Sequence, residues 1–393
     1  MQLALLVVVA AFVGAMVGVE RTVLPLLASG EFGISSNAAT LSFIASFGAV
    51  KAASDLVAGR LADTHGRRRV LIGGWLAGVP VPLILMWAPS WGWVVGANVL
   101  LGVNQGFAWS AAQIMKVDLV SDRRRGLAMG VNEFAGYTGV AAAAYATGAL
   151  AVRMGLRPAP FVLGVACAAV GLTLSLFARE TPHAAPGAPD RVASDPGASL
   201  WRNGRYWATC GLGLLNNLRD SAMWGLAPLL LSSRGMDVRG IGGVSAIYLA
   251  AWGCPQIVTG PLSDRVGRRP LIVVGLALQA VGLAQLARDV DASGAQLAAL
   301  VIGLGTALVY PTLLAAAPDV APRAPRGAVM GIYRSMRDGG YVVGAVVAGP
   351  LADRVGIVAA MGALAVVMGL ASAPALLLPG RPTSARSCGS RHR

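Results

Sequence analysis

Long apolar stretches recur along almost the whole chain and are separated by short polar breaks. Each stretch holds about twenty residues with few charges, the length that an α-helix needs to cross roughly 30 Å of hydrocarbon. We predict helices, because lipid leaves no partner for a loose backbone and the runs lack the alternation of barrel strands. The pattern predicts twelve spans, at residues 2–28, 38–62, 70–88, 93–115, 127–150, 159–178, 206–232, 240–262, 271–288, 294–317, 327–350 and 357–379.

The composition excludes a soluble domain. Hydrophobic residues make up 55% of the 393 residues and charged residues only 13%, with a mean hydropathy of +0.65. A soluble domain carries about 25% charged residues. The first apolar run follows no basic segment, so we read it as a transmembrane helix and not as a signal peptide. The prediction is an all-α polytopic membrane protein.

The net charge of +14 is distributed unevenly. Because the number of predicted spans is even, the polar breaks form two alternating sets, with twenty Lys and Arg in one set and six in the other. Basic residues concentrate on the cytoplasmic side of membrane proteins. We therefore predict an inner-membrane protein with both termini in the cytoplasm, and the charge needs no nucleic acid to explain it.

The two halves of the chain match each other at a constant offset of 201 residues. Matching positions in three separate breaks include Asp63 with Asp264, Asp118 with Asp319, and Gly148 with Gly349. A register that holds over three breaks indicates a tandem duplication of a six-helix unit. Parallel halves of this kind place a binding site near the bilayer midplane and give alternating access by rocking.

The repeat also predicts the domain organisation. The two bundles comprise residues 1–178 and 206–379. They are joined by a cytoplasmic linker at 179–205, rich in Pro, Ala, Gly, Asp and Arg, and followed by a cytoplasmic tail at 380–393.

One loop motif occurs twice at equivalent places. GRLADTHGRRR (59–69) follows the second span and GPLSDRVGRRP (260–270) follows the eighth. This resembles the signature loop of the major facilitator superfamily, and the resemblance covers essentially the whole chain. It implies a transporter of twelve helices in which the loop aspartate latches against the start of the eleventh span, or of the fifth by symmetry. The gating residues so implied are Gly59, Asp63, Gly66, Arg67, Arg68, Gly260, Asp264, Gly267, Arg268, Arg125 and Arg326.

The residue types in this loop suit a gate. Gly59 and Gly66 allow close helix contact and a tight turn, and Asp63 can face a helix N-terminus in one conformer only. The alternative is that the loop merely keeps positive charge in the cytoplasm, which explains the arginines but neither the glycines nor the aspartate.

Three features depart from the family pattern. Thr64 and His65 replace the usual Arg-x of the loop, and Gly102 stands where the R-x-x-Q-G segment of the fourth span has arginine. The fifth span lacks the Gly-Pro pair of many drug:proton antiporters, which weakens an efflux assignment without excluding it.

Ionisable side chains at membrane depth are costly and are candidate functional sites by default. Lys51 lies twelve residues before Asp63, about 18 Å from the end of its helix and near the midplane. Asp55 follows one turn later and can neutralise it. The candidates for the cavity or for coupling are Asp220, Lys51, Asp55, Glu133, Arg219, Asn216, Asn217, Arg337, Asp338, Glu20 and Arg21.

Asp220 is the first candidate for a protonatable coupling residue, because it shares a helix face with Asn216 and Asn217. The equal alternative is a structural ion pair with Arg219, Lys51 or Arg337. Glu20 and Arg21 suit a local pair or an extracellular gate as well as substrate contact, while Glu133, Arg334, Arg337 and Asp338 favour cytoplasmic gate networks. Five aromatic residues either line a cavity or pack between helices: Trp109, Tyr137, Trp224, Trp252 and Tyr310.

The sequence holds no phosphate loop, metal cluster or nucleophile motif, so we expect no enzyme and no cofactor beyond a proton gradient. The prediction is a monomeric, proton-coupled secondary transporter of a small organic solute in a lipid bilayer, with efflux preferred. The alternatives are an importer or facilitator of a metabolite or anion, and a non-transporting membrane receptor. The receptor would need a sensor domain that the 27-residue linker does not offer.

Overall fold

The computed structural model describes residues 1–121, 125–181, 200–288, 291–321 and 326–376. The first half contains α1 (Gln2–Arg21), α2 (Leu24–Gly30), α3 (Asn37–Thr40), α4 (Ser42–His65), α5 (Arg67–Gly78), α6 (Pro80–Trp87), α7 (Trp91–Asn104), η1 (Gln105–Trp109), α8 (Ser110–Asp118), α9 (Arg125–Met154) and α10 (Ala159–Phe177). The second half contains α12 (Gly204–Leu218), η3 (Ala222–Leu226), α13 (Ala227–Ser233), α14 (Val238–Gly253), α15 (Gln256–Val266), α16 (Arg268–Ala287), α17 (Ala292–Val320), α18 (Arg326–Val355), α19 (Ile357–Leu370) and α20 (Ser372–Ala375).

These elements group into the twelve predicted spans, and several spans are built from two or three pieces. Pro80 begins α6, and Pro25 and Pro228 stand in the first turns of α2 and α13, where a missing backbone N–H does least harm. The fourth and seventh spans each contain one π-helical turn, η1 and η3. Within the described residues, seven of the helical segments are long and apolar enough to cross a membrane, judged by length and composition alone.

Most helices run a few residues past the predicted spans. The span expected at 127–150 is α9, Arg125–Met154, and the one expected at 327–350 is α18, Arg326–Val355. Helical hydrogen bonding continues past the last apolar residue, so hydropathy underestimates helix length. Residues 377–379 of the last predicted span lie outside the described residues, as do residues 182–199 of the predicted linker and the whole predicted tail.

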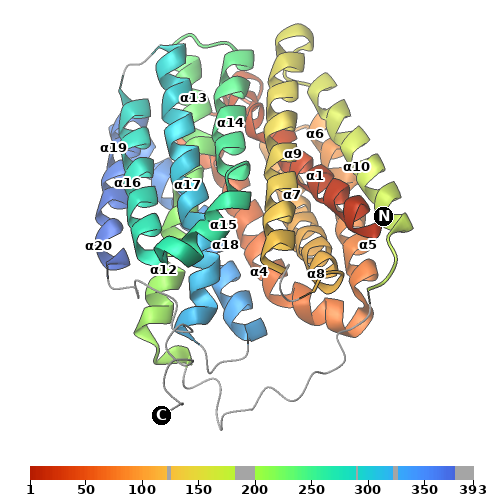
Figure 1. Cartoon of the computed structure of the whole chain (residues 1–393). Coiled ribbons are helices and arrows are strands. Elements are labelled where there is room, and N and C mark those ends of the chain that lie inside the picture. The colour runs from red at the N-terminus through yellow and green to blue at the C-terminus, as the bar shows by residue number, and fades with distance from the viewer. Residues whose placement is uncertain (122–124, 182–199, 289–290, 322–325, 377–393) are drawn as a thin grey trace, which may run out of the picture.

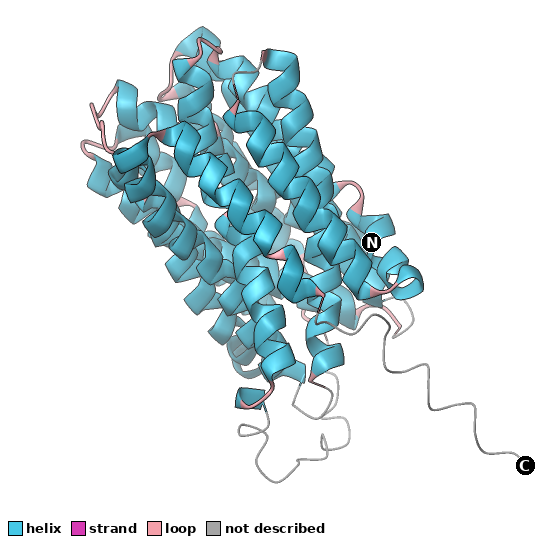
Figure 2. Ribbon diagram, turned by 90° about the vertical axis from the view of Figure 1, so that its left-hand side faces the viewer, coloured by secondary structure: helices cyan, strands magenta, loops and turns pink. Residues whose placement is uncertain are grey.

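The two halves stand side by side as helical bundles, coloured red to yellow and green to blue in Figure 1 and seen from the side in Figure 2. They meet along two helix pairs, α9 with α14 and α4 with α18. The offset of 201 residues is visible in the backbone, because Gly66 and Gly267 have φ of 90° and 100°, and Gly155 and Gly356 have φ of 83° and 85°. The predicted duplication is confirmed in three dimensions.

The two ends of the interface are packed differently. At the end that carries few arginines, an added Cβ on Gly148 would lie 2.8 Å from the Val238 carbonyl oxygen, and one on Gly349 would lie 2.6 Å from the Ala38 Cα. At the arginine-rich end, a Cβ on Gly130 would meet nothing closer than 3.7 Å, and one on Gly331 would meet nothing within 4 Å. The halves are therefore closed tightly at the arginine-poor end and more loosely at the other.

Within the first half, glycine allows α1 and α9 to touch through their backbones. A Cβ on Gly14 would lie only 2.0 Å from the carbonyl oxygen of Gly136, a distance that no adjustment of a side chain can relieve. Such small residues let membrane helices approach closely, which replaces the hydrophobic drive that lipid does not provide.

We expect Gly14→Ala to lower the free energy of unfolding by about 1–3 kcal/mol, the usual range for overpacking. Gly211→Ala is the matched control, because a Cβ there meets nothing within 4 Å and alanine favours a helix. Thermal unfolding in detergent measures both variants. Equal midpoints for the two would contradict the backbone contact.

Candidate functional site

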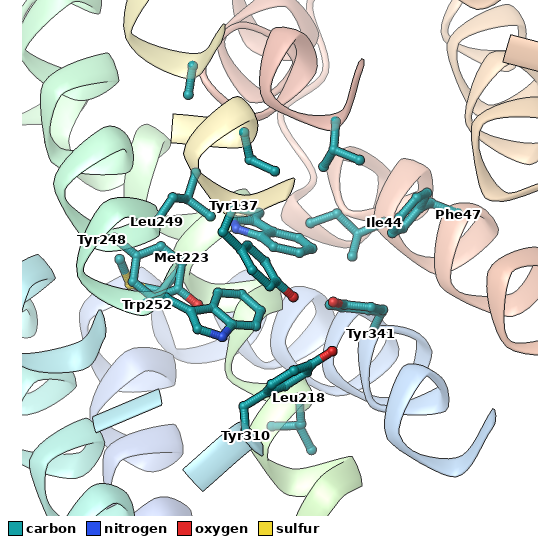
Figure 3. Packing of buried hydrophobic residues seen from close by; sticks show 14 of the residues in the cluster. Ile44, Phe47, Tyr137, Leu218, Met223, Tyr248, Leu249, Trp252, Tyr310 and Tyr341 are labelled. Atoms are coloured by element: carbon teal, nitrogen blue, oxygen red, sulfur yellow. The ribbon is translucent and has the colours of Figure 1, made fainter. Parts of the chain in front are cut away.

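A small cavity of about 40 Å³ lies between the halves. Its walls come from both bundles and consist of Val17, Phe47, Lys51, Gln105, Trp109, Tyr137, Val140, Trp224, Tyr310, Arg337 and Tyr341. Figure 3 shows the hydroxyl groups of Tyr137, Tyr310 and Tyr341 converging on one space. The volume suits one or two water molecules, so the structure has the site in a nearly closed form.

Aromatic rings form most of this wall. Four of the five aromatic residues considered in the sequence line the cavity: Trp109, Tyr137, Trp224 and Tyr310. The fifth, Trp252, lies behind Tyr137 and stacks on it across the interface of α9 and α14, with ring centroids 4.0 Å apart. Tyr341, which the sequence analysis missed, stacks on Trp224 at 5.1 Å.

Lys51 stands between two carboxylates at the junction of α4 and α18. Its Nζ donates to Asp55 Oδ2 at 2.9 Å, as the one-turn spacing predicts, and also to Asp338 Oδ2 in the other half. The other oxygen of Asp55 accepts from the Ser110 hydroxyl at 3.1 Å. The lysine is therefore shared between its own helix and the opposite bundle.

Asp338 is the most heavily bonded carboxylate of the junction. It accepts from Arg337 Nε at 2.7 Å and Nη2 at 2.9 Å, from Asn217 Nδ2 at 3.1 Å, and from Lys51. The side chain of Asp338 is fully buried. Both cations and the amide are needed to replace the water that this carboxylate lacks.

Glu133 joins the two halves through neutral donors. It accepts from Trp109 Nε1, Gln113 Nε2 and Asn132 Nδ2 at 3.0 to 3.3 Å, and from the Tyr310 hydroxyl of the second half at 3.1 Å. Tyr310 in turn accepts from Arg337 Nη1 at 2.8 Å. A continuous hydrogen-bonded chain thus runs from Glu133 through Tyr310 and Arg337 to Asp338.

Asp220 forms a pair with Arg219 inside the second half. Its Oδ1 accepts from Arg219 Nη2 at 2.7 Å and from the Tyr248 hydroxyl, and Arg219 also donates to the Thr306 hydroxyl. Arg219 and Asp220 directly follow α12, Tyr248 lies on α14 and Thr306 on α17, and none of the four lines the cavity. An ion pair with Arg219 is one of the partners that the sequence left open for Asp220 as the alternative to a coupling role.

The remaining polar candidates of the first and seventh spans lie in different settings. Asn217 bonds Asp338, while Asn216 accepts from Gln279 at 3.0 Å and donates to Asn217. Glu20 and Arg21 are both buried, and no hydrogen bond or ion pair joins the two side chains.

Comparison with known proteins identifies the architecture. The sequence pattern of the Major Facilitator Superfamily matches residues 3–217 and again residues 209–392. The chain belongs to the major facilitator superfamily. It is 26% identical over 314 residues to an uncharacterised MFS-type transporter of Salmonella typhimurium, with 76% of each chain covered. The family is one of membrane transporters and not of enzymes.

Two further matches agree with this. A Cupriavidus pinatubonensis protein described as a "Probable 4-methylmuconolactone transporter" is 24% identical over 326 residues, with 79% of this chain and 74% of that one covered. The crystal structure of a point mutant of the nucleoside transporter NupG superposes with a TM-score of 0.77 at 12% identity, over 96% of this chain and 98% of that one. The structural match shows the shared major facilitator fold.

The two signature loops make equivalent ion pairs, each within the loop and with an aspartate of another helix. Arg67 lies 3.0 Å from Asp118 and 4.0 Å from Asp63, and Arg268 lies 3.2 Å from Asp319 and 2.9 Å from Asp264. Asp63 and Asp264 are 68% and 65% exposed. The side chains of Arg125 and Arg326, to which the family latch is expected to reach, lie outside the described residues.

The glycines of the loops differ in role. Gly66 and Gly267 have positive φ and make the predicted tight turn. The close helix contact expected at Gly59 is not made, since a Cβ on Gly59 or Gly260 would meet nothing within 4 Å. Both residues lie on open helix faces in this state.

The sequence analysis did not identify two carboxylates that accept hydrogen bonds from the backbone of remote helices. Glu180 accepts from the backbone N–H groups of Arg67 and Arg68 at 2.8 and 3.1 Å, and its negative charge offsets the positive dipole end at the start of α5. The Arg68 side chain donates to the Leu176 carbonyl at 2.8 Å. Asp353 crosses the interface to the start of α3, as described below. Both carboxylates bond backbone groups that are distant in sequence, so no local motif predicts these contacts.

At Gly102, where the family's fourth-span segment has arginine, the neighbouring helix leaves no room for a side chain. A Cβ on Gly102 would lie 2.8 Å from the Phe47 carbonyl oxygen and 3.1 Å from the backbone nitrogen of Lys51. A larger side chain at 102 would therefore push α7 away from α4.

Asp353 ties the arginine-poor end shut. Its carboxylate accepts from the backbone N–H of Asn37 at 2.6 Å and of Ala38 at 3.1 Å, and from the Ser36 hydroxyl at 2.8 Å. Desolvation opposes ionisation of Asp353, but these donors outweigh it together and lower the pKa of the carboxyl group. A lowered pKa means that the contact is complete at neutral pH and is lost as the pH falls through that value.

We expect Asp353→Ala at neutral pH, or strong acidification of the unmodified chain, to open this end. Labelling of Ala38→Cys by an impermeant maleimide, in a chain whose own cysteines are replaced by serine, measures the opening for the variant. Spin-label distances between the halves measure it under acid. Asp291→Ala is the control, because Asp291 accepts from Gly294 N at 2.8 Å and caps only its own helix. Unchanged labelling in Asp353→Ala would contradict the tie.

Removing Asp338 should destabilise the fold. In Asp338→Leu, Arg337 loses its carboxylate partner and Lys51 loses one of two, and a broken buried pair typically costs about 3–5 kcal/mol. Asp264→Leu, whose carboxylate is mostly exposed, should cost at most about 1 kcal/mol. Unfolding in detergent tests the difference, and similar midpoints would show that the junction contributes little.

Proposed function

We propose that the chain is a secondary active transporter that moves a small organic solute by alternating access and couples this movement to protons. The sharing of Lys51 between Asp55 and Asp338 supports the proposal most directly. A cation between two carboxylates changes partner when either one takes a proton. Because one carboxylate belongs to each half, that change alters the attraction between the bundles.

Asp55 is the proton site that we favour. It accepts hydrogen bonds from Lys51 and Ser110, whereas Asp338 has bonds from both Arg337 nitrogens, from Asn217 and from Lys51. Protonation of Asp55 therefore breaks fewer contacts. With Asp55 protonated, Lys51 bonds Asp338 alone and ties α4 to α18, and with Asp55 ionised the lysine is divided and the tie is weaker.

The solute would act on the same groups. Lys51 and Arg337 both line the cavity, so a bound solute competes directly for the cations that hold the carboxylates. Binding and protonation then favour or oppose one another through shared contacts, which is what coupling requires. The aromatic wall suits a solute with an apolar, flat body.

We propose an inner-membrane location with the arginine-rich end in the cytoplasm, so that both termini are cytoplasmic and the closed end faces outward. The functional unit proposed is the monomer, with the lipid bilayer and the solute as partners. We favour export over import, because the aromatic rings that form most of the wall accept apolar bodies of many shapes and select weakly among solutes. Proton-coupled import, or facilitated passage of a metabolite or anion, is the alternative.

Reconstituted vesicles with an imposed pH gradient test the proposal. A panel of small aromatic and aliphatic solutes identifies one that moves, and solute-dependent proton movement is then recorded. We expect Asp55→Asn to abolish proton movement while solute exchange without a gradient continues. Asp220→Asn is the matched comparison, since its carboxylate is paired within one half, and we expect it to keep coupling.

Each outcome has a defined meaning. Coupling lost in Asp220→Asn and kept in Asp55→Asn would return the role to Asp220. Solute flux that ignores the gradient in the unmodified chain would leave a facilitator. The direction of the gradient that drives accumulation separates export from import, and no flux of any solute would favour a receptor.

A further inference from the structure

Arg21, the last residue of α1, is buried in an unusual way. Its side chain is fully buried, and none of its three guanidinium nitrogens has a hydrogen-bond partner. Its Cζ lies 4.6 Å from the Phe47 ring, 4.5 Å from the Trp224 ring and 5.5 Å from the Phe43 ring. Among the described residues, no carboxylate oxygen comes within 4.0 Å of it.

The other two arginines buried at membrane depth are paired. Arg219 bonds Asp220 at 2.7 Å, and Arg337 bonds Asp338 at 2.7 Å and Tyr310 at 2.8 Å. Aromatic faces attract a cation, by about 0.5–2 kcal/mol each, but they accept no conventional hydrogen bond from its N–H groups. A guanidinium has five donors, and burying them without acceptors is costly. Structural pairing therefore accounts for Arg219 and Arg337 but not for Arg21.

Arg21 adjoins the cavity. Phe47 and Trp224, the two rings closest to the guanidinium, both line the cavity, as does Val17 one turn earlier on α1. Phe47 belongs to the first half and Trp224 to the π-helical turn η3 of the second. The guanidinium therefore lies between a ring of each half, beside the space that a solute would enter.

The neighbouring acids leave the donors of Arg21 free. Glu20 precedes it on α1, about 100° around the helix, and its carboxylate makes no hydrogen bond with the guanidinium. The Oδ1 of Asp220 is already bonded to Arg219 and Tyr248, and its Oδ2, which has no hydrogen-bond partner, forms no ion pair with Arg21. Glu20 and Asp220 thus moderate the positive charge without bonding the guanidinium.

We propose that Arg21 is the anion-binding group of the solute site, and that the transported solutes are small organic acids with an apolar body. The assignment rests on the proposed transport function. A planar guanidinium matches a carboxylate through two parallel hydrogen bonds, and the rings of Phe47 and Trp224 flank the body of the acid. The solute supplies the acceptors that the protein withholds.

Equilibrium binding to the purified full-length chain in detergent tests this without any gradient or flux. The probes are two pairs that differ in charge, benzoate with benzamide and butanoate with butanamide, titrated by calorimetry. We expect the acid of each pair to bind more tightly than its amide. Arg21→Gln should weaken the binding of the acids by roughly 10- to 100-fold and leave the amides unchanged.

Two neighbouring substitutions sharpen the result. Arg21→Lys keeps the positive charge but loses the planar pair of N–H donors, so its affinity for the acids should lie between those of the unmodified chain and Arg21→Gln. Glu20→Gln removes the nearby negative charge and should tighten acid binding, the opposite sign to Arg21→Gln on the adjacent residue. A purely structural role for Arg21 would change acids and amides alike.

The proposal is overturned if acids and amides bind the unmodified chain equally, if none of the four probes binds, or if Arg21→Gln keeps full acid binding. Should Arg21→Gln fail to fold, the comparison of acids with amides in the unmodified chain and in Arg21→Lys decides. A chain that binds acids through Arg21 but moves no protons in vesicles would disprove the coupling and keep this site.

Discussion

Charges buried in a membrane protein are costly, and at the junction of α4 and α18 they are matched within each half as well as between the halves. The first bundle brings Lys51 with Asp55, and the second brings Arg337 with Asp338. Each pair is neutral by itself, so the bundles can part without leaving a bare charge in a dry interior. The bond from Lys51 to Asp338 is additional to these two pairs and is the one that joins the bundles. Relative movement of the bundles can therefore make and break it.

The aromatic rings around this junction serve the same requirement. Tyr137 with Trp252 and Phe47 with Tyr341 give the interface apolar faces that pack across the halves at 4.0 and 5.8 Å. Rings can slide against one another with little loss of contact, whereas hydrogen-bonded groups cannot. The polar chain from Glu133 to Asp338 thus passes through a surface that is otherwise suited to movement. Arg21 lies among such rings without a polar partner, which is why its chemistry is directed to a ligand.

Much of the fold could be predicted from the sequence, because lipid imposes simple rules. Span length, the offset of 201 residues and the turns at Gly66 and Gly267 all follow from local composition and repetition. The pair of Lys51 and Asp55 was predictable because it lies within one helix turn. The bond to Asp338 was not, since it depends on how α4 and α18 face each other across the bundles.

Other features of the site depend on the same kind of long-range geometry. The sequence places Asp220 beside two asparagines, but only Asn217 turns toward the junction while Asp220 turns to Arg219 and Tyr248. Helical spacing shows which residues share a face and not what that face meets. Asp353 and Glu180 bond backbone groups of remote helices, and the opening left at Gly59 depends on the conformation of the interface.

The four interface glycines have a consequence for how sequences of this architecture diverge. Gly130 and Gly148 on α9 correspond to Gly331 and Gly349 on α18, so both ends of the molecule are built from the same parts. One methyl group at 148 or 349 penalises the arrangement seen in the structure, while at 130 or 331 it is tolerated there. Single substitutions at these glycines, which do not line the cavity, can therefore change which end of the interface is closed in the most stable conformation of close relatives.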